Sequence, residues 1–63
     1  MAKKLTDIYA AVKNEGGLAF TMRMAMMTGI SSQQAGAAPD SPDNMKKFTD
    51  AYKEITGKTC PIK

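Results

Sequence analysis

Residues 18–28 read LAFTMRMAMMT, and this stretch decides what fold the chain can adopt. A helix advances by about 100° per residue, so the apolar side chains of a helical stretch would divide into two nearly opposite rows. The first row is Leu18, Met22, Ala25 and Met26, and the second row is Phe20, Met24 and Met27. A helix that is apolar on two sides needs cover on two sides. Either two other helices of the chain enclose it, or the chain covers one row and a second copy covers the other.

The segment before this stretch, residues 5–15, has the pattern of a helix with one apolar face. Its apolar side chains stand at positions i, i+3, i+4 and i+7, which is the spacing of a single helical stripe: Leu5, Ile8, Tyr9 and Val12. Gly16 and Gly17 then interrupt the helical pattern. We therefore predict one helix before the two glycines and another after them.

The segment after residue 40 begins with a strong helix start signal. Ser41 suits the N-cap, Pro42 suits the first helical position, and Asp43 adds a carboxylate to the first turn. Gly57 supplies the position that ends the helix. Between these two points, apolar side chains recur at helical spacing: Met45, Phe48, Tyr52 and Ile55.

The connection between the methionine stretch and the last helix contains its own local signals. Gly29 is placed as a left-handed C-cap, and Ser31 and Gln34 have the spacing of a capping box. Gly36 and Pro39 limit the helix that follows to one or two turns.

Together these signals predict an all-α fold, a small three-helix domain with a short extra helical turn between the second and last helices. The helices are expected at residues 5–15, 17–28 and 42–56, and the short turn at residues 32–37. Residues 5–57 are expected to form a single domain, and residues 1–4 and 58–63 to be flexible ends.

Length and composition favour self-association. Domains of about 60 residues bury only about 60% of the surface that their unfolded chain exposes, and this chain has 63 residues. Its one cysteine, Cys60, has no partner for an internal disulfide, and without histidine the usual zinc ligand set is missing. We expect no cofactor and no metal. Association with a second copy is the remaining common way to stabilise so small a domain.

Composition also argues against catalysis. The chain lacks histidine, the commonest general base, so nothing of that kind can activate Cys60. Asp40 and Asp43 are better explained as acids at helix starts than as an acid–base pair. The glycines at 16 and 17 lack the lysine of a phosphate-binding loop. We therefore expect a protein that is not an enzyme and has no catalytic residues.

The sequence favours a cytoplasmic protein with no membrane partner. A single unpaired cysteine suits a reducing compartment, and residues 1–10 lack the continuous apolar run of an export signal. The most apolar run, residues 18–27, contains Arg23 and is shorter than the roughly 20 residues of a spanning helix.

The methionines support the leading functional hypothesis, a non-enzymatic protein-interaction module that self-associates as a homo-oligomer. Methionine fills irregular gaps both in cores and at surfaces that accept a partner. We predict that Phe20, Met24 and Met27 contact the partner. Thioether sulfurs at such spacing also occur in copper(I) sites, but a helix points Met22 and Met24 in opposite directions, which disfavours that alternative.

A small DNA-binding regulator is the second hypothesis. Residues 22–38 have the outline of a helix-turn-helix, with Gly29 in the turn and a second helix in which Ser32, Gln33 and Gln34 could contact base edges. The charge distribution counts against it, because residues 5–57 hold five basic side chains against six acids. Nucleic-acid-binding domains usually present a basic face.

Overall fold

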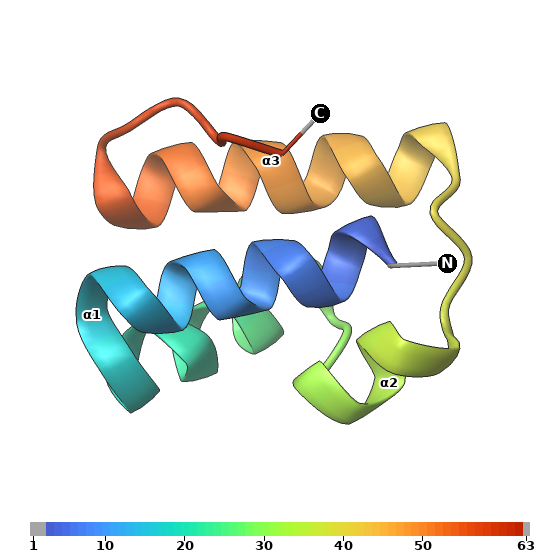
Figure 1. Ribbon diagram of the computed structural model, residues 1–63, viewed down its shortest axis with the longest axis horizontal. Helices are drawn as coiled ribbons and strands as arrows, with labels where there is room; N and C mark the ends of the chain where they lie inside the picture. Colours follow the sequence, from blue (N-terminus) through green and yellow to red (C-terminus); the bar gives the residue numbers. More distant parts are fainter. Residues whose placement is uncertain (1–2, 63) are drawn as a thin grey trace.

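The computed structural model describes residues 3–62, which form three helices and no strand within that range (Figure 1). α1 spans Lys4–Thr28, α2 spans Ser32–Ala37 and α3 spans Pro42–Thr56. The predicted all-α class is confirmed, and so are the bounds of the short middle helix and of the last helix. The flexibility expected for residues 1, 2 and 63 lies outside the described residues.

α1 consists of two helical halves that meet in a sharp bend at Gly17. The backbone of Gly17 has φ 70° and ψ −148°, a combination that is essentially restricted to glycine. In Figure 1 the first half crosses the molecule beside α3, and the second half turns back below the first. The break predicted at the two glycines is therefore present, as a bend inside α1.

Gly16 is required at the same bend for a different reason. A Cβ atom on Gly16 would overlap the ring of Phe20, which lies four residues further along the chain. The aromatic ring thus packs directly against the glycine backbone. One glycine permits the change of direction, and the other permits the close contact that follows it.

The core lies between the two halves of α1 and α3. Its largest fully buried side chains are Phe48, Leu5, Ile8, Met24 and Val12. The ring of Tyr9 packs edge-on against Phe48, with centroids 5.5 Å apart and planes at 77°. The Tyr9 hydroxyl donates a hydrogen bond to the carbonyl oxygen of Ile30. Tyr9 therefore ties the first half of α1 both to α3 and to the turn that follows the second half.

Asp40 caps the start of α1 although it lies far away in the sequence. Its Oδ2 accepts a hydrogen bond from the backbone N–H of Lys4 at 3.0 Å, and its Oδ1 accepts one from Leu5 at 3.4 Å. These are N–H groups that a helix start leaves without partners within the helix. Asp43 lies in the first turn of α3. Both acids are at helix starts, as predicted, but they serve different helices.

The chain after α3 turns back along that helix (Figure 1). Gly57 ends α3 in the left-handed conformation, with φ 73°. Beyond it Cys60 is buried, and Ile62 packs against the core. The core therefore continues past residue 57, where the sequence placed the end of the domain. The flexibility expected for residues 58–62 stays a prediction.

Candidate interaction site

The second half of α1 leaves one row of large apolar side chains in solvent. Leu18 is 71% exposed, Met22 is 57% exposed and Met26 is 83% exposed. These residues stand four apart, so they lie one above another on a single helix face. At 1.5 Å per residue the row is about 12 Å long. All three belong to the first row defined from the sequence.

Two members of the second row, Phe20 and Met24, point in the opposite direction, toward the core. Met24 is fully buried, and Phe20 is partly buried against the same cluster. Thr28 completes the buried side of this segment, and its hydroxyl donates to the carbonyl oxygen of Met24 at 2.7 Å. The chain thus covers Phe20 and Met24 of the second row and leaves the large side chains of the first row in solvent.

The fold separates the three residues predicted to contact a partner. Phe20 and Met24 pack inside the chain, whereas Met27 is 48% exposed. The accessible apolar face belongs instead to the first row. The spacing correctly predicted two opposed rows, but it carries no information on which row the bend at Gly17 turns inward. A role of Met27 in partner contact stays a prediction.

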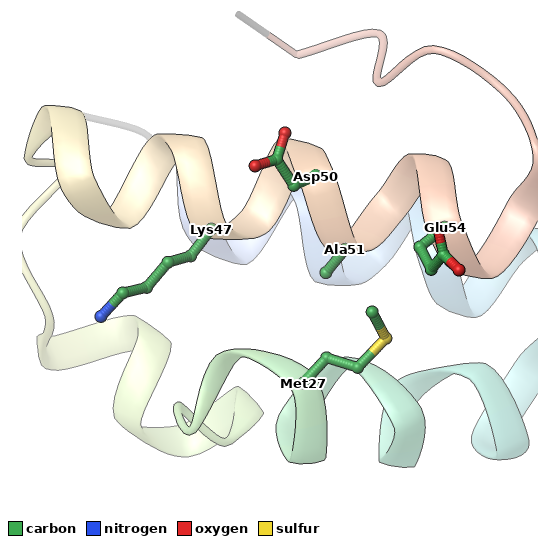
Figure 2. Close-up of a pocket in the computed structure, with 5 residues that line it drawn as sticks. All are labelled: Met27, Lys47, Asp50, Ala51 and Glu54. Carbon is green, nitrogen blue, oxygen red and sulfur yellow. The ribbon is translucent and has the colours of Figure 1, made fainter.

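Met27 lies at a groove between the second half of α1 and α3. Figure 2 shows its side chain pointing toward α3, where Ala51 faces it. The groove has a volume of about 440 Å³ and is lined by Met27, Lys47, Asp50, Ala51 and Glu54. Its centre is apolar and its edge on α3 is charged. The groove therefore belongs to the contact between two packed helices and is separate from the exposed row.

The electrostatic surroundings of the exposed row are simple. Arg23 is exposed beside it, and no acidic residue occurs between residues 16 and 39. Within residues 3–62, the one ion pair joins Lys58 Nζ to Glu15 Oε1 at 2.8 Å, next to the bend. Its hydrogen bond and the negative charge of Glu15 raise the pKa of Lys58. The row thus has an uncharged centre and a weakly basic edge.

The residues of the DNA-binding hypothesis lie at the start of α2. The predicted caps are confirmed, because Gly29 is left-handed and Ser31 and Gln34 form a reciprocal capping box. Ser32, Gln33 and Gln34 are all exposed. However, the Gln34 side-chain oxygen accepts from the backbone N–H of Ser31 at 3.0 Å. This contact and the length of only six residues reduce what α2 can present to a base edge.

Other chemistry has little support in the described part of the chain. Residues 3–62 contain no group of three His, Cys, Asp or Glu side chains that could hold a metal ion. The buried Met24 points away from the exposed Met22 and Met26, so the three sulfurs do not converge. The thiol of Cys60 is buried and donates to the carbonyl oxygen of Ile62 at 3.4 Å.

Within residues 3–62 the fold is a small three-helix domain that leaves the apolar row of Leu18, Met22 and Met26 in solvent. No helix within residues 3–62 has the length and apolar character needed to span a membrane. The chain matches no protein-family model, no curated protein and no solved structure.

Proposed function

We propose that this protein is a non-enzymatic interaction module that self-associates through the exposed row of Leu18, Met22 and Met26. The observation that carries the proposal is that three large apolar side chains, each more than half exposed, stand in line on one helix face. Apolar residues scattered singly over a surface are ordinary, whereas contiguous apolar patches mark interaction sites. Burial of this row in a partner would remove it from water.

A second copy of the chain is the partner that the row fits best. A symmetric dimer requires one patch that is complementary to itself. The two methionines favour this, because their flexible, unbranched side chains adapt their packing to a copy of the same row. Arg23 lies at the edge and no acidic residue occurs between residues 16 and 39, so pairing two rows buries no charge at the centre. A charged centre would make such an interface costly.

The size of the row predicts a weak dimer. The chain has 4135 Å² of accessible surface, and a standard interface would cover about 800 Å² of each partner. Such an interface would occupy about a fifth of this surface. A row about 12 Å long covers less than that. Interfaces below the standard size are typical of transient association, so we expect a dissociation constant in the micromolar to millimolar range.

Analytical ultracentrifugation of matched lysine variants tests the proposal. Met26→Lys places a charge on the exposed row, so it is expected to weaken association at least tenfold and to leave the helical circular dichroism spectrum unchanged. Gln33→Lys adds the same charge on exposed α2 and should associate like the wild type. A wild type that stays monomeric at millimolar concentration, or a Met26→Lys variant that associates as tightly as the wild type, would overturn the proposal.

DNA binding is the competing outcome, and a mobility-shift series in salt detects it. Contacts to phosphates make affinity fall steeply as ionic strength rises. Binding at low salt that Gln33→Ala weakens and Met26→Lys does not would replace the interaction module by the helix-turn-helix hypothesis. The absence of binding at low salt would remove the DNA-binding hypothesis.

A further inference from the structure

We infer that Met22 and Met26 form an oxidation site that converts the exposed row from apolar to polar and so switches off docking; the effect on docking rests on the proposed function. The observation behind it is that methionine side chains of one helix differ sharply in their exposure to solvent. Met26 is the most exposed of the exposed large apolar side chains, and Met22 is more than half exposed. Met24, which lies between them in the sequence, has no exposed surface.

The oxidant is a hydroperoxide such as hydrogen peroxide. The thioether sulfur attacks one peroxide oxygen, an S–O bond forms and the O–O bond breaks. Sulfur loses two electrons, and the proton of the attacked OH group moves to the departing oxygen, which leaves as water from hydrogen peroxide or as an alcohol from an organic hydroperoxide. The product is methionine sulfoxide, which is polar and which reductases can convert back. Because the sulfur must meet the peroxide directly, exposed methionines react before buried ones.

The positions of Met22 and Met26 mean that their oxidation removes most of the apolar surface of the row. Met22 is the middle member of the row, four residues from both Leu18 and Met26. Two sulfoxides would leave Leu18 as the one large side chain of the row that is wholly apolar. Burial of a sulfoxide without a hydrogen-bond donor is unfavourable, so the modified rows would no longer pair. Met24 holds the opposite side of the same helix in the core, so the fold survives the modification.

Peroxide treatment of dilute protein followed by peptide mapping tests the site. Trypsin cleaves after Arg23 and thereby separates Met22 from Met24, and tandem fragmentation of the peptide of residues 24–46 distinguishes Met24 from Met26. We expect Met22 and Met26 to be oxidised at least tenfold faster than Met24. Oxidation should also shorten retention on a hydrophobic-interaction column and weaken association at least tenfold, without loss of helical circular dichroism. At concentrations where the protein is dimeric, Met22 and Met26 should react more slowly, because the partner covers them.

The double variant Met22→Leu, Met26→Leu is the matched control, because it keeps the row apolar and removes both sulfurs. It should keep its retention and its association after peroxide. Equal oxidation rates at Met24 and Met26 would overturn the oxidation site. Unchanged association of the oxidised wild type would overturn the switch. An untreated wild type that never associates would overturn the proposed function and the switch together, whereas the rates and the column retention would still decide the oxidation site.

Discussion

The two rows of residues 18–28 have the same kind of side chain and opposite fates. Met24 is completely buried, whereas Met26, two residues later, is the most exposed member of the segment's large apolar side chains. Propensity and hydrophobicity do not distinguish the two methionines. The difference arises because the bend at Gly17 returns the helix with one side toward the first half of α1 and α3. The direction in which the chain returns after the bend thus decides which apolar side chains are buried, and the other row is left in solvent.

The largest expected effect compares one residue from each row. Met24→Ala removes a fully buried side chain from the core and should lower the free energy of unfolding by about 2–5 kcal/mol. Met26→Ala truncates a solvated side chain and should change it by less than about 0.5 kcal/mol. Urea denaturation at concentrations where the protein is monomeric measures both. Similar losses in the two variants would show that the rows are not divided as the structure has them.

Substitution of Gly17 tests whether the bend determines which side of residues 18–28 faces the core. Alanine is strained at φ 70° and ψ −148°, so Gly17→Ala should destabilise the fold by about 1–3 kcal/mol. The control is Gly36→Ala in α2, where nothing lies within 4 Å of the added Cβ and φ is not positive. That variant should be neutral or more stable by up to about 1 kcal/mol, because alanine restricts the unfolded chain. If the two variants are equally stable, the backbone conformation of Gly17 is not what the fold requires at the bend.

Substitution of Asp40 tests how much the cap at the start of α1 contributes to stability. Asp40→Ala removes the acceptor for the N–H groups of Lys4 and Leu5 and should destabilise the protein by about 1 kcal/mol. In a domain of this size that is a fall of about 4–8 °C in Tm. Asp40→Asn keeps a side-chain acceptor and should retain most of the stability. If the two variants melt together below the wild type, the charge of Asp40 and not its capping contact is responsible.

The smallest predicted effect is a loss of stability at high pH, through Tyr9 in the core. Burial raises the pKa of Tyr9, while the nearby hydroxyl of Thr28 acts in the opposite direction. The unfolded chain therefore ionises first as the pH rises. The stabilisation is complete below the ordinary tyrosine pKa of about 10 and is lost above it.

Urea denaturation at a series of pH values measures this loss, with Tyr9→Phe as the control. The raised pKa of Lys58 adds a fall of the same sign, because its partner Glu15 favours the charged amine in the folded state. Tyr9→Phe should therefore show a shallower decline above pH 10 than the wild type. Parallel curves for the two proteins would exclude Tyr9 as the source.

Much of the fold could be predicted because its signals are local. The stripes at residues 5–12 and 45–55 predicted amphipathic helices, and the caps at Ser31, Ser41 and Gly57 predicted where helices begin and end. Each signal acts within about one helical turn, so the residues concerned are neighbours in the sequence. The candidate site was predicted only in part: the two opposed rows were found, but the sequence did not indicate that Met24 is buried while Met22 and Met26 are exposed.

By itself the sequence determined that the chain is helical, where its helices break, and that residues 18–28 carry two opposed apolar rows. Only the tertiary structure decided that Met24 turns inward and Met26 outward, that Asp40 caps a helix that starts 36 residues before it, and that Cys60 joins the core. The physical reason is the separation along the chain over which each interaction acts. Capping and periodicity act between neighbours along the chain, whereas the choice of an inner row depends on how segments far apart in sequence pack against one another.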